Sequence, residues 1–164
     1  MSLSQFDAAY FERAIELAAE AESQNNLPIG AVIALDGEII SAGKNTIWHP
    51  KFNPNRHAEI EALRSVPEHL WQQSRDMTLI TTLEPCLMCT GAILLHHVGR
   101  VLFGSSDSNG GASQVTGHKP AFLEKQIART ACIGPAYAER CYTLNVRVRI
   151  MIAKSKDAAQ TLHP

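Results

Sequence analysis

Two cysteines near the middle of the chain have the spacing of metal ligands. Cys86 and Cys89 stand three residues apart, directly after Pro85. Proline is favoured in the first turn of a helix, and two side chains three positions apart on a helix share one face. The partial positive charge of a helix N-terminus lowers the pKa of thiols beside it, so both cysteines could bind zinc as thiolates.

The segment His57-Ala58-Glu59, upstream of these cysteines, could supply a third ligand and a carboxylate to a zinc ion bound by the two thiolates. A structural zinc site needs four protein ligands, and neither Cys132 nor Cys141 belongs to a closely spaced pair. We therefore expect His57 as the third ligand and water in a fourth, open position, as in catalytic zinc sites. Zinc lowers the pKa of bound water to about 7. The carboxylate of Glu59 could take the proton of that water and pass it to a leaving group.

Each motif alone has an ordinary explanation. An isolated Cys-x-x-Cys also occurs in redox pairs and in halves of structural zinc knuckles, and an isolated His-x-Glu arises by chance. Both motifs in this order, with Pro85 in place and a helical pattern after each, favour one catalytic zinc ion per chain.

Together the two motifs resemble the cytidine deaminase superfamily, whose signature is H-x-E followed by P-C-x-x-C. More narrowly, the chain resembles the branch that holds tRNA adenosine deaminases, guanine deaminases and fungal-type cytosine deaminases. The resemblance spans residues 6–113 and is weak from residue 114 onward. It includes Pro28-Ile29-Gly30-Ala31-Val32, Asp36-Gly37, Gly43-Lys44-Asn45 and Arg100-Val101-Leu102-Phe103-Gly104.

The resemblance implies a zinc-dependent hydrolase that acts on C–N bonds of cyclic amidines. It would release ammonia from an amino-substituted nucleobase, nucleoside or related heterocycle, and it would form a homodimer. His57, Cys86 and Cys89 would hold the zinc ion, and Glu59 would shuttle protons between the activated water and the substrate. The residues that hold the base would be Asn45, Ala58 and, through its backbone N–H, Cys86.

The substrate is less well defined. The segment from Phe103 to Ala112 resembles tRNA adenosine deaminases. Against a tRNA substrate, the chain has 15 Lys and Arg residues against 16 Asp and Glu residues, and we expect no basic helix near the C-terminus. A small nucleobase or nucleoside is therefore favoured, with tRNA-specific adenosine deamination as the alternative. A zinc-stabilised binding module without activity is a second alternative, although such a module would not need Glu59.

Composition and length are those of an ordinary globular domain. The 164 residues are enough for a single domain, with a core over 6–153 and a tail over 154–164, and 45% of them are hydrophobic. No apolar run reaches the length of a membrane span, and the first residues lack the pattern of a signal peptide. Four cysteines, two of them assigned to zinc, favour a cytoplasmic location.

Hydrophobic periodicity predicts a three-layer α/β/α fold with a mixed five-stranded sheet. A long connection before the last strand favours parallel pairing with the fourth strand. Both helices that follow the metal motifs should begin at one edge of the sheet and converge on the zinc. Helices are expected over 6–24, 57–65, 86–98 and 121–128, possible helical turns over 67–74 and 136–140, and strands over 29–35, 38–43, 77–82, 101–104 and 144–153, with a hairpin turn at 36–37.

Several side chains outside the motifs could contribute to the site or to the packing around it. The loop over 45–56 leads to His57, and in it Trp48 and Phe52 could stack on a base or simply pack. Gly91 would allow the zinc helix to pack closely on the sheet. We expect His49 and Lys51 to be solvated, His96 and His97 to be structural, and Phe122, Tyr137 or Tyr142 to close the pocket or belong to the core.

Overall fold

The computed structural model describes residues 4–112 and 119–161. Residues 113–118, between the fourth expected strand and the helix expected over 121–128, and the last three residues of the tail lie outside the described residues. In chain order the elements are α1 (Gln5–Ser23), β1 (Gly30–Leu35), β2 (Glu38–Lys44), α2 (Ala58–Arg64), the 3-10 helix η1 (Glu68–Asp76), β3 (Thr78–Leu83), α3 (Leu87–Leu95), β4 (Arg100–Ser105), α4 (Ala121–Ile127), β5 (Ala131–Ile133) and α5 (Ala138–Thr161).

The five strands form one mixed sheet in the order β2-β1-β3-β4-β5. β1 pairs antiparallel with β2 and β3, whereas β3, β4 and β5 run parallel to one another. Asp36 and Gly37 join β1 to β2, and both have positive φ angles, 51° and 88°. Aspartate and glycine tolerate this left-handed backbone, which a two-residue hairpin requires, so the predicted turn is confirmed.

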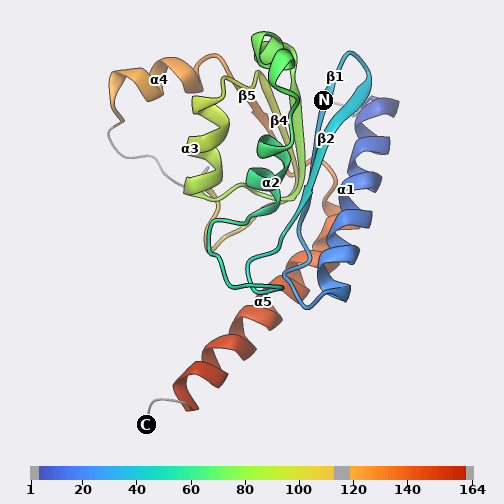
Figure 1. The fold of residues 1–164 in the computed structure, drawn as a ribbon, viewed down its shortest axis with the longest axis vertical. Helices are drawn as coiled ribbons and strands as arrows, with labels where there is room; N and C mark the ends of the chain where they lie inside the picture. The colour runs from blue at the N-terminus through green and yellow to red at the C-terminus, as the bar shows by residue number, and fades with distance from the viewer. Residues whose placement is uncertain (1–3, 113–118, 162–164) are drawn as a thin grey trace.

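Helices cover both faces of the sheet, which confirms the predicted three-layer fold (Figure 1). Successive residues of a strand face opposite sides. Accordingly, Val32 and Ala34 of β1 pack towards α1 and the start of α5, whereas Ala31 and Ile33 pack towards α2 and α3. The two helices that follow the metal motifs therefore share one face of the sheet.

An ion pair ties the first helix to the sheet. Ser4 and Asp7 form a reciprocal capping box at the start of α1. The Asp7 carboxylate, 5% exposed, also accepts two hydrogen bonds from the Arg100 guanidinium, of 2.7 and 3.0 Å. This pair joins residues 93 positions apart in the sequence.

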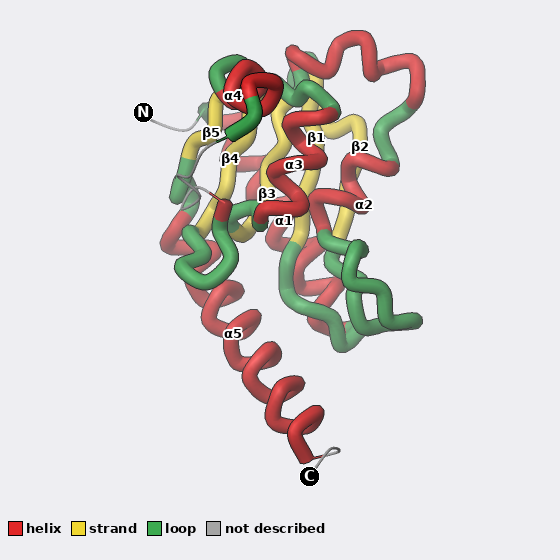
Figure 2. Tube along the Cα trace, turned by 90° about the vertical axis from the view of Figure 1, so that its left-hand side faces the viewer, coloured by secondary structure: helices red, strands yellow, loops and turns green. Residues whose placement is uncertain are grey.

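The C-terminal part of the prediction was wrong. Residues 144–153 belong to helix α5, not to a strand, and the fifth strand is the short β5. The parallel pairing with β4 is as expected, but a different segment provides it. Residues 154–161, predicted as a tail or short helix, extend α5, which projects away from the sheet (Figures 1 and 2).

Competing periodicities explain this error. Val146, Arg147, Val148, Arg149 and Ile150 alternate between apolar and basic side chains, as an amphipathic strand does. Over a longer window the buried residues instead recur at helical spacing, and a helix allows them all to face the sheet. These buried residues are Cys141, Leu144, Asn145 and Val148.

The structure also tests the roles expected for Gly91, His96 and His97. A Cβ atom added at Gly91 would meet nothing within 4 Å, so this glycine does not serve close packing of α3 on the sheet. His96 stacks at a tilt on Trp71, with ring centroids 4.8 Å apart, and His97 contacts Arg75, which confirms structural roles for both histidines.

None of the described helices is long and apolar enough to cross a membrane.

Candidate zinc site

Two helices begin side by side, each directly after a predicted metal ligand. His57 is the N-cap of α2 and Cys86 is the N-cap of α3, while Cys89 lies in the first turn of α3. One donor atom from each of these three residues lies within 4.8 Å of the other two. One imidazole nitrogen and two sulfurs at this separation fit zinc, whose bonds to such ligands are about 2.0–2.3 Å long.

Hydrogen bonds within this cluster separate the pKa values of the two thiols. The Cys86 thiol has its pKa lowered to about 4, chiefly by its hydrogen bond with Cys89. His57 lowers the pKa of Cys86 as well, because its Nδ1 lies 3.7 Å from Cys86 Sγ. The same contact raises the pKa of His57. The pKa of Cys89 is raised by its bond with Cys86 and by burial. Cys86 is thus held as the thiolate that metal binding requires.

Glu59 is enclosed beside the three ligands. It lies in the first turn of α2, and only 4% of it is exposed. Its Oε2 accepts a hydrogen bond from Cys89 Sγ and its Oε1 accepts one from Thr81 Oγ1, each 3.5 Å long. Burial raises the pKa of this carboxyl group, which brings it closer to the range where a group can both take up and release protons.

The predicted base-holding residues also lie at this edge of the sheet. Ala58, completely buried, stands between His57 and Glu59. Asn45 follows β2 and is also completely buried, and its Oδ1 accepts the backbone N–H of Ile47 at 3.2 Å. Its Nδ2 has no hydrogen-bond partner within the described part of the chain. A buried amide with a free donor is suited to binding an acceptor on a substrate.

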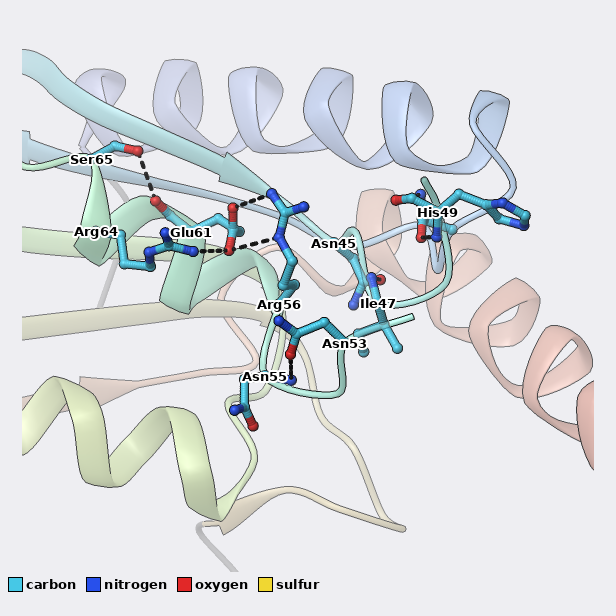
Figure 3. Close-up of polar contacts among 10 residues, drawn as sticks. Asn45, Ile47, His49, Asn53, Asn55, Arg56, Glu61, Arg64 and Ser65 are labelled. Carbon is cyan, nitrogen blue, oxygen red and sulfur yellow. Dashed lines mark hydrogen bonds and ion pairs between the residues drawn. The ribbon is translucent and has the colours of Figure 1, made fainter. Parts of the chain in front are cut away.

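The loop between Asn45 and His57 is closed at its neck, next to the ion pair of Arg56 and Glu61 that Figure 3 shows. The backbone N–H of Thr46 donates to the carbonyl of Arg56 at 3.0 Å, which places Asn45 and His57 on neighbouring ends of the loop. Two hydrogen bonds of 3.3 and 2.8 Å join the Arg56 guanidinium to Glu61 of α2. The neck is therefore fixed to the helix that carries Glu59.

Comparison with known proteins identifies the family. Residues 4–105, more than half of the chain, match the family model of the cytidine and deoxycytidylate deaminase zinc-binding region. The chain belongs to this deaminase family. Zinc is its cofactor, and His57, Cys86 and Cys89 are positioned to bind a metal ion.

Individual relatives extend this finding. A tRNA-specific adenosine deaminase of Haemophilus influenzae is 43% identical over 112 residues, which make up 66% of this chain and 64% of that relative. A structure from a study of A-to-I editing by tRNA:A34 deaminases has a TM-score of 0.68 at 29% identity, and the match covers 84% and 99% of the two chains. For guanine deaminase of Bacillus subtilis the TM-score is 0.57 at 31% identity, with 70% and 71% covered. The deaminase thus matches less than two thirds of the first relative's length.

A segment after β4 borders the deaminase site through contacts that no local sequence pattern predicts. The backbone of Gly111 forms an isolated antiparallel β-bridge with that of Cys86. The backbone N–H of Asp107 donates to the Glu84 carboxylate at 2.9 Å. A Cβ atom on Gly111 would lie 2.3 Å from the Glu84 carboxyl carbon, so a larger residue there would force the Glu84 carboxylate to move. Residues 106–112 are thereby held against the start of α3.

The projecting helix α5 reaches this segment. The Arg149 guanidinium donates to Ser108 Oγ at 3.2 Å, and Asn145 Nδ2 donates to the carbonyl of Ser106 at 2.8 Å. Between helix and segment lies an open hollow of about 600 Å³, lined by Asp107, Asn109, Gly110, Arg149, Ile152, Ala153 and Lys156. Arg149 and Lys156 of α5 therefore lie beside residues 106–112, the segment that borders the site.

The aromatic residues considered from the sequence are placed differently from one another. Tyr137 stacks on Phe11, and Trp48 packs against the core, so both contribute to packing. Phe52 is 66% exposed in the loop that leads to His57. Phe122 and Tyr142 are exposed and line neither the hollow above nor a second, mostly apolar cavity of about 400 Å³ between α3, α4 and β4. His49 and Lys51 are exposed, as expected.

Proposed function

We propose that this deaminase hydrolyses the exocyclic amino group of adenosine in tRNA, giving inosine and ammonia. The observation that carries the proposal is the basic helix beside the site. α5 contains five basic residues against two acidic ones, which corrects the expectation that the C-terminal region lacks such a helix. Arg140 and Arg147 pair with Glu12 and Glu22 of α1, whereas Arg149 and Lys156 line the hollow. Relatives named tRNA-specific adenosine deaminases, including the one 43% identical, support the same substrate.

Electrostatics explain how a chain of slightly negative net charge could still bind tRNA. Phosphate binding depends on local cations, because charges farther apart than about 8 Å are screened at physiological salt. Arg149 and Lys156 line the hollow next to residues 107–110, and Lys154 is exposed on the same helix. A phosphate backbone following α5 would bring a neighbouring base towards the zinc ligands.

The proposed mechanism assigns each residue one task. When bound by His57, Cys86 and Cys89, zinc supplies a water nucleophile at neutral pH. Glu59 would take one proton of the water and deliver it to the ring nitrogen, and it would then move the proton of the newly added hydroxyl to the amino group, which leaves as ammonia when the C–N bond breaks. The substrate base would be held by the Asn45 side chain and by the backbone of Ala58 and Cys86.

A small free base or nucleoside is the second candidate. The formal net charge of −1 favours it, because a polynucleotide is attracted less strongly than by a basic protein. The similarity to a guanine deaminase, at 31% identity, supports the same alternative. For a non-catalytic zinc module we find less support, since nothing in a purely structural site calls for the buried Glu59.

Ammonia release from the zinc-loaded chain tests the proposal. The panel contains tRNA transcripts, guanine, adenine, cytosine, their nucleosides, a pterin and an aminotriazine, with Glu59→Ala as the control. We expect ammonia and inosine from tRNA alone. Release from a free base, with tRNA unchanged, would overturn the tRNA proposal and favour the second candidate.

We further propose that the deaminase is a homodimer. Apolar side chains are exposed on α3 and α4, among them Leu87, Leu95 and Phe122, and such surfaces are often covered by a partner. Sedimentation at micromolar concentration should give twice the mass of the 17.9 kDa chain. A monomer under these conditions would contradict the proposal.

A further inference from the structure

Asn26 lies in the turn between α1 and β1 and contacts the loop that leads to the zinc ligands. It is completely buried. Its Oδ1 accepts the backbone N–H groups of Trp48 and His49 at 2.9 and 3.0 Å. Its Nδ2 donates to the carbonyls of Gln24 and His49 at 3.3 and 3.2 Å. All four bonds go to the backbone, and three of them go to the loop.

These bonds fix the orientation of the Asn26 amide. Two N–H donors face one of its terminal atoms and two carbonyls face the other, so a flipped amide would lose all four bonds. The backbone at Trp48 and His49 is consequently held in one position relative to the turn. A polar group this deeply buried and fully bonded resists displacement.

The fixed position of Trp48 and His49 also constrains Asn45, because Ile47 connects the two. Ile47 precedes Trp48, and its backbone N–H donates to Asn45 Oδ1 (Figure 3). This bond makes the Asn45 oxygen face Ile47 and leaves Nδ2 as the group without a partner in the described residues. Asn45 therefore offers a donor, and its orientation depends on where the segment 47–49 lies.

The loop is fixed independently at its other end. The bond between Thr46 and Arg56, and the two bonds between Arg56 and Glu61, hold the neck to α2. Those contacts would survive the loss of Asn26. Removal of Asn26 should consequently loosen the segment 47–49 without releasing His57.

We infer that Asn26 is a positioning residue of the deaminase. It holds the segment 47–49 so that the Asn45 amide presents its N–H group, and the site consequently selects a base with a hydrogen-bond acceptor at that position. The inference rests on the proposed role of Asn45 in substrate binding. It predicts that Asn26 acts on substrate affinity and that it does so through Asn45.

A double-mutant cycle tests this dependence. The substrate is an anticodon stem-loop RNA, or the base that the ammonia panel identifies instead. Asn26→Ala should raise KM about tenfold and leave kcat within about threefold, as expected for the loss of one hydrogen bond to the substrate. In an Asn45→Ala background the same substitution should change KM less than about twofold, because the group it positions is gone. Equal effects in both backgrounds would overturn the inference.

Two further variants separate positioning from stability. Asn26→Asp keeps the acceptor for Trp48 and His49 and should keep KM within about threefold, although loss of the donor lowers the melting temperature. Asn53→Ala is the matched control in the same loop, since among the described residues its exposed side chain bonds Asn55 alone. It should leave KM unchanged. A KM for Asn26→Asp as high as for Asn26→Ala would contradict positioning through these two N–H groups.

Amide hydrogen exchange adds a test that needs no substrate. In Asn26→Ala the amides of residues 47–49 should exchange faster, while zinc remains at one ion per chain and exchange in α2 is unchanged. Unchanged exchange at 47–49 would show that Asn26 does not hold the loop and would overturn the inference. Because this measurement is independent of turnover, its result stands even if the proposed tRNA substrate is wrong.

Discussion

Gly43 of β2 packs directly against the backbone of α2 at Ala58. A Cβ atom added to Gly43 would lie 2.3 Å from the Ala58 carbonyl oxygen and 2.3 Å from the Ala62 nitrogen. Distances below 3.0 Å force one of the two backbones to move. Since Ala58 lies between His57 and Glu59, this contact sets the distance between the sheet and the residues proposed for chemistry.

The substitution Gly43→Ala should therefore lower activity as well as stability. The added methyl group would push α2 outward and cost about 1–3 kcal/mol of unfolding free energy. Displacement of Glu59 relative to Cys89 should lower kcat by more than the loss of folded protein explains. Urea unfolding and kcat, measured on the same zinc-loaded sample, test this. The control is Gly91→Ala, where an added Cβ meets nothing within 4 Å.

Removal of zinc should abolish turnover without erasing the fold. The three ligands lie at the N-termini of helices that are also packed on the sheet through Leu63, Ile93 and neighbouring core residues. Dialysis against a chelator should stop ammonia release, and added zinc should restore it. His57→Ala should prevent stoichiometric zinc binding. Full activity of the chelated enzyme would contradict the zinc assignment.

The pair of Asp7 and Arg100 should give stability that depends on pH. Its hydrogen bonds with Arg100 hold the pKa of Asp7 below the ordinary value of 3.8. A lowered pKa in the folded state stabilises the fold above the unfolded-state pKa, and this contribution disappears as the pH falls through the folded-state value. Asp7→Asn should therefore cost about 1–2 kcal/mol near pH 7, a modest value because Arg100 remains 36% exposed.

Urea unfolding of the zinc-free chain at several pH values measures this difference. Use of a chelator throughout removes the separate effect of zinc release in acid. The gap between wild type and Asp7→Asn should be constant above pH 5 or so and should shrink below about pH 3.8. A gap that widens in acid would show that the ion pair is not its origin.

Charge reversal on α5 should weaken tRNA binding and its dependence on salt. Arg149→Glu combined with Lys156→Glu removes two cations from the hollow beside residues 107–110. If each contacts one phosphate, the slope of log K against log salt should fall by about 2. Arg13→Glu on α1 is the control, because Arg13 pairs with Glu16 and Glu20 instead. An unchanged slope in the α5 variant would exclude this helix from phosphate binding.

The sequence predicted the metal ligands because their spacing is local. Pro85, Cys86 and Cys89 belong to one turn, and the order of helices and strands up to β4 follows from hydrophobic periods and a hairpin turn. Their convergence with His57 follows once both helices are assigned to one face of the sheet. The predicted fold class and zinc cofactor are accordingly confirmed, and His57, Cys86 and Cys89 are positioned to bind a metal ion.

Prediction from the sequence failed for features that depend on tertiary contacts. Alternation over 146–150 suggested a strand, but packing of Cys141, Leu144 and Val148 on the sheet selects a helix. No local pattern distinguishes Asn26, and only the fold shows that its amide binds a loop 22 residues later. The approach of Gly111 to Glu84 likewise depends on three-dimensional packing that no local pattern encodes.

The most direct test of the account measures zinc and turnover together in Glu59→Gln. Glutamine keeps the size of the side chain but cannot take up the water's proton. The account predicts one zinc ion per chain, as in the wild type, with ammonia release from tRNA reduced by about 10²–10⁴-fold. Wild-type turnover by zinc-loaded Glu59→Gln would contradict the proposed mechanism, because it would show that Glu59 does not carry the proton.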